Sequence, residues 1–150
     1  MVNEDYRDLL SALVARQARF LVVGAHALAV HGYPRATVDI DIWIEPAREN
    51  ARRVWQALAE FGAPLEALDV NEADLVRPAV VVQFGLPPNR IDILTAVSGL
   101  EFDKAWINRI EEPVEGVRVP VIGLADLIEN KRSTGRDKDR VDIKGLNGES

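Results

Sequence analysis

The sequence predicts a mixed α/β (α+β) fold, in which a sheet of about five strands is flanked by helices. Short apolar runs bounded by glycine or proline alternate along the chain with segments of helical periodicity. Two of those runs are joined by a hairpin-length linker, which favours a mixed sheet over a regular parallel winding. The length of 150 residues fits one domain, residues 1–150, with short helices at its C-terminal end.

The first three elements are expected to form a helix, a strand and a second helix. Leucine and valine recur at helical spacing over Glu4–Gln17. Four apolar residues, Phe20–Val23, stop at Gly24 and are typical of a buried strand. The alanine-rich segment Ala25–Val30 predicts a short helix that Gly32 closes.

The middle of the chain supplies three strands and a long helix. Val38–Ile44 alternates in character for seven residues, which is the period of a strand. Pro46 is expected to open a helix that continues to Phe61. Val80–Phe84 and Arg90–Leu94 then predict two antiparallel strands of a hairpin.

The last third is expected to be mostly helical. Phe102–Ile110 predicts a helix, and Val117–Ile122 predicts an edge strand, because Pro120 removes one donor from the hydrogen-bond ladder. Two short helices, Leu124–Arg132 and Lys138–Leu146, are expected to follow.

Composition excludes several classes of protein. The absence of cysteine excludes a disulfide scaffold, a cysteine-ligated zinc site and a thiol nucleophile. The net charge of −6 does not indicate attraction to nucleic acid or to an anionic membrane. No apolar run approaches the roughly 20 residues of a membrane span, and the first ten residues carry acids where a signal peptide would be basic. We therefore expect a cytoplasmic protein without a membrane partner.

Two aspartates are the most informative residues. Asp39 and Asp41 lie two apart on the predicted strand, so their side chains share one face with their Cα atoms about 7 Å apart. Two adjacent carboxylates repel each other, and Mg²⁺ prefers such oxygen ligands. Asp92 lies between two isoleucines in another predicted strand, where packing alone does not explain an acid. Three carboxylates could hold two metal ions for displacement at phosphorus, although acid–apolar–acid is also common on a solvated strand face.

Gly24 is the third feature. A glycine between a strand and a helix lets a ligand approach the backbone, and amides at the start of the helix can face phosphate. Such a turn is weak evidence alone and stronger in combination with the acids.

Three further residues are candidate phosphate ligands. Arg35 and Thr37 precede the acidic strand and could reach phosphate oxygens, and Lys131 belongs to a basic patch in an acidic chain. A solvated loop or an exposed helix end explains them equally well. His26 and His31 are five residues apart, which does not suit a helical metal pair, and both are expected to be structural.

Taken together, these motifs resemble the polymerase-β-type nucleotidyltransferase superfamily. The resemblance rests on Val22–Ala25, Asp39–Ile42 and Ile91–Ile93. Residues 24–44 are most similar to the minimal or abortive-infection-type nucleotidyltransferases of bacterial toxin–antitoxin systems. Residues 130–142 resemble a Lys/Arg-Asp block near the end of such proteins.

The resemblance implies an enzyme that moves a nucleoside monophosphate from an NTP, expected to be ATP, to a hydroxyl. Asp39, Asp41 and Asp92 would be catalytic ligands of Mg²⁺ or Mn²⁺. Gly24 and Ala25 would lie against the nucleotide phosphates, and Ala25 departs from the glycine or serine of the family.

The sequence does not identify the acceptor of the nucleoside monophosphate. Only two short helices are expected after the core, so a partner protein or a second copy of the chain is expected to supply part of the acceptor site. A nucleic-acid acceptor is compatible with this chemistry but is not indicated by the charge. The alternatives are an inactive nucleotide-binding or antitoxin module of the same fold, which Ala25 favours, and a metal-dependent phosphohydrolase that uses water.

Overall fold

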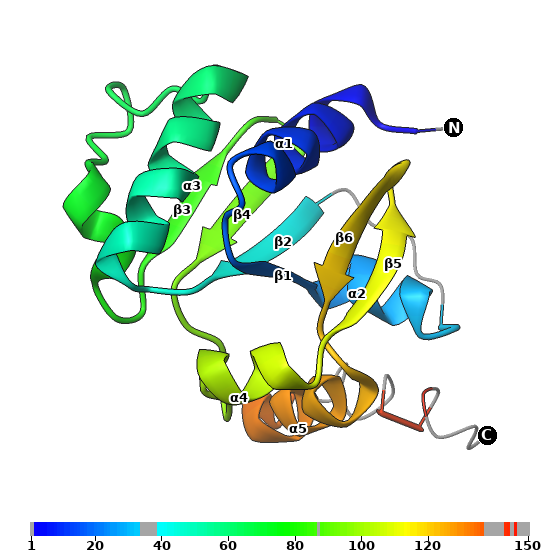
Figure 1. Ribbon diagram of the computed structural model, residues 1–150. Helices are drawn as coiled ribbons and strands as arrows, with labels where there is room; N and C mark the ends of the chain where they lie inside the picture. The colour runs from blue at the N-terminus through cyan, green and yellow to red at the C-terminus, as the bar shows by residue number, and fades with distance from the viewer. Residues whose placement is uncertain (1, 34–38, 87, 137–142, 145, 147–150) are drawn as a thin grey trace.

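The protein is a mixed six-stranded sheet with helices on both faces (Figure 1). The computed structural model describes residues 2–33, 39–86, 88–136, 143–144 and 146. The strand order is β3-β4-β2-β1-β6-β5. In chain order the elements are α1 (Glu4–Ala15), β1 (Phe20–Val23), α2 (Gly24–Val30), β2 (Asp39–Ile44), α3 (Arg48–Phe61), the 3₁₀-helix η1 (Glu72–Val76), β3 (Val81–Phe84), β4 (Arg90–Leu94), α4 (Phe102–Ile107), β5 (Ile110–Val114), β6 (Val117–Val121) and α5 (Leu124–Thr134).

The two faces of the central strands carry different residues. Helices α1 and α3 lie side by side over one face, and α4 and α5 lie on the other side of the molecule (Figure 1). Isoleucines of β2 and β4 point to the first face and are buried, whereas the intervening aspartates of both strands remain half-exposed. The core therefore lies mainly between the sheet and the α1/α3 pair. Its fully buried members include Leu9, Leu13, Ile40, Ile42, Val54, Leu58 and Ile93.

Local signals fix the ends of the long helices. The Asn3 side chain caps α1 by accepting a hydrogen bond from the backbone N–H of Tyr6. Gly62, at φ 93°, ends α3 in the left-handed conformation that suits glycine. The predicted helix over Pro46–Phe61 is thus present, but it begins at Arg48, with Ala47 as its N-cap.

The sheet has one strand more than expected. Residues Ile110–Val114 form β5, so the helix that was expected to continue to Ile110 ends at Ile107. This segment contains Glu111, Glu112 and Pro113, which hide the strand signal in the sequence. Charged residues and proline are typical of an edge strand, where one side of the backbone is not paired.

The prediction that β6 is the edge strand is wrong. β6 lies between β1 and β5, and β5 is the edge. Pro120 is tolerated because the pairing of β6 with β1 lies beyond it, at Val121. The hydrogen bond to the carbonyl oxygen of Val22 comes from the N–H of Ile122, so the N–H that proline lacks is not needed for it.

Other predicted elements agree with the structure to within a few residues. The first helix ends at Ala15 rather than Gln17, which has φ 56°. The short helix η1 was not predicted. Most of the predicted helix Lys138–Leu146 and the start of the predicted strand at Val38 lie outside the described residues. Within the described part of the chain, no helix is long and apolar enough to cross a membrane.

Candidate active site

Asp41 and Asp92 occupy opposite positions on neighbouring strands. β2 and β4 are parallel, and their register pairs Asp41 with Asp92 and Asp39 with Arg90. Residues two apart on a strand share a face, so the three predicted aspartates lie on the same side of the sheet. The buried isoleucines 40, 42, 91 and 93 hold both strands against the core from the opposite face.

The Asp41 carboxyl group holds a proton more tightly than an ordinary aspartate. Burial, followed by its hydrogen bond to Asp92 and the nearby charges of Asp92 and Asp39, raises the pKa of Asp41 to about 7. The positive charge of Lys131 acts in the opposite direction. A partly buried carboxyl group that lies beside a second carboxylate is a site where a cation would be favourable.

Gly24 lies directly against Asp41. Its φ of 68° is in the left-handed region, and a Cβ atom at this position would overlap Oδ2 of Asp41. The group that lies against Gly24 is thus a carboxylate of the acidic cluster, and the approach of a phosphate to this glycine stays a prediction. Ala25 follows in the first turn of α2 and is half-buried.

Asp39 is engaged by a residue that the sequence motifs did not single out. An Nη2 atom of Arg90 donates to Oδ2 of Asp39 at 2.6 Å, with 36% and 26% of the two side chains exposed. Arg90 lies two positions before Asp92 on β4, so strand periodicity alone would have placed it on the acidic face.

Gln83 is a second residue that the sequence motifs missed. Its Nε2 donates to Oδ1 of Asp92 at 2.9 Å across the β3–β4 pair. The predicted hairpin could have indicated this contact, because residues opposite each other on paired strands lie on the same face.

Lys131 approaches the aspartates from α5. The side chain is buried, with 7% exposed, and its charge acts on the Asp41 carboxyl group. The structure thus brings Gly24, Asp39, Asp41, Asp92 and Lys131 together. Arg35 and Thr37 lie outside the described residues.

A polar network adjoins the acidic cluster. The Tyr6 hydroxyl lies 2.9 Å from the carbonyl oxygen of Arg90, and the Tyr6 ring packs edge-on against His26. Burial and the charge of Asp39 raise the pKa of Tyr6 to about 12, whereas burial lowers the pKa of His26. His26 Nε2 lies 3.6 Å from Glu115 in the β5–β6 turn. These contacts tie α1, α2 and the turn together beside Asp39, and no sequence motif indicates them.

Comparison with known proteins identifies the family. Residues 1–147 match the family model described as nucleotidyltransferase of unknown function (DUF6036). The chain belongs to this nucleotidyltransferase family. No protein of curated function is significantly similar to the sequence.

The nucleotidyltransferase assignment agrees with the fold. A crystal structure of a Thermotoga maritima protein, provisionally assigned as a nucleotidyltransferase, superimposes with a TM-score of 0.59. The match covers 99% of this chain and 96% of that chain at 19% sequence identity. At 19% identity the likeness shows a shared fold and nothing more specific.

The acids of this family member offer oxygen donors of the kind that bind divalent cations, without a complete cluster. Among the described residues, no three His, Asp or Glu side chains are arranged to hold a metal ion. Asp41 and Asp92 nevertheless offer adjacent oxygen donors, and the pKa of Asp41 is raised by burial first and by the neighbouring carboxylates second, so a cation would favour the ionised form. Asp39 lies on the same face with its carboxylate against Arg90.

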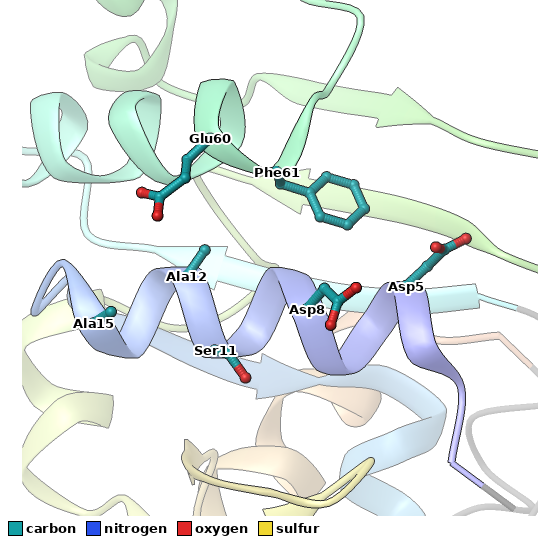
Figure 2. A pocket seen from close by; sticks show the side chains of 7 residues that line it. All are labelled: Asp5, Asp8, Ser11, Ala12, Ala15, Glu60 and Phe61. Carbon is teal, nitrogen blue, oxygen red and sulfur yellow. The ribbon is translucent and has the colours of Figure 1, made fainter.

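A separate cavity of about 520 Å³ lies between α1 and α3 (Figure 2). None of the predicted site residues that the structure describes lines it, and its acids are partly paired, since Glu60 accepts from Arg16 at 2.9 Å. Substitutions of its lining residues therefore change side chains that lie outside the acidic cluster. Its lining residues are Asp5, Asp8, Ser11, Ala12, Ala15, Glu60 and Phe61.

Proposed function

We propose that the protein transfers a nucleoside monophosphate from an NTP to a hydroxyl group and releases pyrophosphate. The observation that carries this proposal is the pairing of Asp41 with Asp92 in parallel register, with Asp39 on the same face and Gly24 against Asp41. A proton-sharing carboxyl pair beside a glycine turn suits a cation that carries a triphosphate. Membership of a nucleotidyltransferase family supports the same reaction.

Each site residue has a proposed role. Asp39, Asp41 and Asp92 would hold Mg²⁺ or Mn²⁺, with Asp92 on the side of the attacking hydroxyl. Bound there, the cations would stabilise the attacking and leaving oxygens of an in-line displacement. Lys131, whose charge already acts on Asp41, would neutralise phosphate charge. Ala25 would offer its backbone amide to the phosphates, and we include Arg35 and Thr37 among the phosphate ligands.

The nucleotide and the acceptor are further parts of the proposal. We propose ATP as the donor and a partner protein, or a second copy of the chain, as the source of part of the acceptor site. The surface of β3 beside Asp92 is exposed to solvent, since Gln83, which donates to Asp92, is exposed, and 59% of Val81 is exposed. A macromolecular hydroxyl could approach over this strand. A role in a toxin–antitoxin pair would follow from such a partner.

The experiment is a transfer assay with ATP labelled at the α-phosphate, Mg²⁺ or Mn²⁺, and a lysate as the source of acceptors. We expect label on a macromolecule with the wild type and no label with Asp41→Asn or Asp92→Asn. Glu60→Gln, which removes an acid from the α1/α3 side, should transfer as well as the wild type. Equal labelling by all four proteins would contradict the proposal.

Ala25 favours a second candidate function, a nucleotide-binding module without turnover. An alanine lacks the hydroxyl with which a serine could bind phosphate. In the same assay, binding of ATP without transfer would support this module. Release of labelled monophosphate without an acceptor would indicate a phosphohydrolase instead.

A further inference from the structure

Arg90 is placed where a positive charge opposes a complete metal site. It faces Asp39 across the β2–β4 pair, and the two side chains form a 2.6 Å charged hydrogen bond. Asp92 is two residues further along the same strand and faces Asp41. One guanidinium group therefore lies within a face that otherwise carries three carboxylates.

The ion pair opposes the binding of one cation by all three carboxylates. A carboxylate oxygen that accepts from a guanidinium group cannot turn to a divalent cation without losing that bond. A cation at Asp39 would also be repelled by the Arg90 charge at short range. Among the described residues, no three acidic or histidine side chains are arranged to hold a metal ion.

Arg90 also has the chemistry to leave Asp39 for another anion. Its side chain is 36% exposed, and no group among the described residues accepts a hydrogen bond from its buried Nε–H. A guanidinium group binds phosphate oxygens through two parallel N–H donors, a geometry that ammonium lacks. A triphosphate that reached the Asp41–Asp92 pair would pass close to this group.

We propose that Arg90 is an exchangeable counter-ion, which holds Asp39 in the metal-free protein and moves to the triphosphate when nucleotide and metal bind together. The inference rests on the proposed function for the nature of the second anion. It makes metal and nucleotide binding cooperative, because the cation gains Asp39 only when Arg90 gains phosphate. Metal alone binds weakly, since Arg90 then has no anion to replace Asp39.

The test is titration with Mn²⁺, followed by electron paramagnetic resonance, without nucleotide and with a non-hydrolysable ATP analogue. In the wild type, the analogue is expected to strengthen Mn²⁺ binding. Arg90→Gln is expected to bind Mn²⁺ alone about tenfold more tightly, because a repelling charge is removed, and to lose most of the strengthening by the analogue. Arg53→Gln, which removes an arginine from the exposed surface of α3, should match the wild type in both titrations.

Arg90→Lys keeps the positive charge at this position but removes the two parallel N–H donors of the guanidinium group. It should keep the weak Mn²⁺ binding of the wild type and bind the analogue several-fold less tightly, and it serves as the test if Arg90→Gln does not fold. Unchanged or weaker binding of Mn²⁺ alone by folded Arg90→Gln would overturn the inference, as would wild-type behaviour of Arg90→Lys in both titrations. If no variant binds the analogue, the proposed function fails, whereas the Mn²⁺ titration without nucleotide still tests the hold of Arg90 on Asp39.

Discussion

Asp41 and Asp92 face each other across two parallel strands and share a hydrogen bond between their carboxyl groups. The partial burial of Asp41 and its repulsion by Asp92 disfavour the ionised form of Asp41, and a bound cation is expected to favour that form. The stability of the protein should therefore report on this pair, independently of any assay of activity.

The first prediction concerns pH. In the unfolded chain, Asp41 loses its proton near the ordinary aspartate pKa of 3.8, and in the folded chain it does so at about 7. The folded state binds the proton more tightly, so the contribution of Asp41 to stability falls as the pH rises from about 4 to about 7 and stays low above that range. Asp41→Asn removes the ionisable group and with it the decrease in stability at higher pH. It should raise the melting temperature at pH 8 by several degrees, about 3 °C per kcal/mol, and by less at pH 5.

The measurement is thermal unfolding in the presence of EDTA at both pH values. Glu60→Gln serves as the control, since its carboxylate lies on the exposed α1/α3 side. A variant Asp41→Asn less stable than the wild type at pH 8 would contradict the buried-pair explanation.

The second prediction concerns the contact of Gly24 with Asp41. Gly24→Ala introduces a Cβ both into a left-handed backbone position and into the Asp41 carboxylate. Gly135 has the same φ of 68°, and no atom of the described residues lies within 4 Å of a Cβ added there. Gly135→Ala should therefore cost only the conformational term of about 1 kcal/mol, and Gly24→Ala should cost clearly more in urea unfolding.

A double variant isolates the carboxylate. In an Asp41→Ala background, the cost of Gly24→Ala should fall towards that of Gly135→Ala, because the overlapping oxygen is gone. Equal costs of Gly24→Ala in both backgrounds would show that Asp41 is not the obstacle.

The third prediction concerns Ala25. Ala25→Ser adds a hydroxyl in the first turn of α2, next to Gly24. If phosphate lies there, a hydrogen bond to a charged group, worth about 1.5 kcal/mol, should tighten binding of Mg²⁺-ATP about tenfold in calorimetry. Ala29→Ser, at an exposed position of the same helix, should leave affinity unchanged. Equal effects of the two serines would place the phosphates elsewhere.

The fourth prediction concerns Lys131. Its charge lowers the pKa of Asp41, so Lys131→Met should raise that pKa above about 7 and weaken ATP binding. Carbon-detected NMR of the Asp41 carboxyl group measures the first effect. Lys104→Met removes an exposed lysine that pairs with Glu101 and should change neither quantity. An unaltered titration of Asp41 in Lys131→Met would place the ammonium group too far away to act.

The sequence predicted those parts of the site that depend on local periodicity. The alternation of aspartate and isoleucine in β2 and β4 placed the acids on one face, and the run of apolar residues before Gly24 identified β1. That Asp41 stands opposite Asp92 depends on the pairing of strands distant in sequence, which no local pattern fixes.

The errors have physical causes as well. Strand β5 was missed because an edge strand tolerates Glu111, Glu112 and Pro113, which do not resemble a buried strand. The burial of Lys131 and the hold of Arg90 on Asp39 arise from tertiary packing. Strand periodicity could have placed Arg90 on the acidic face, but it could not have indicated which carboxylate the guanidinium group binds.

Isothermal titration of Mg²⁺-ATP into the wild type and into Asp41→Asn/Asp92→Asn tests the acidic cluster most directly. We expect saturable binding by the wild type that disappears when EDTA is added, and no measurable binding by the double variant, with Glu60→Gln behaving as the wild type. Identical binding isotherms for the wild type and the double variant would show that these carboxylates do not form the nucleotide site.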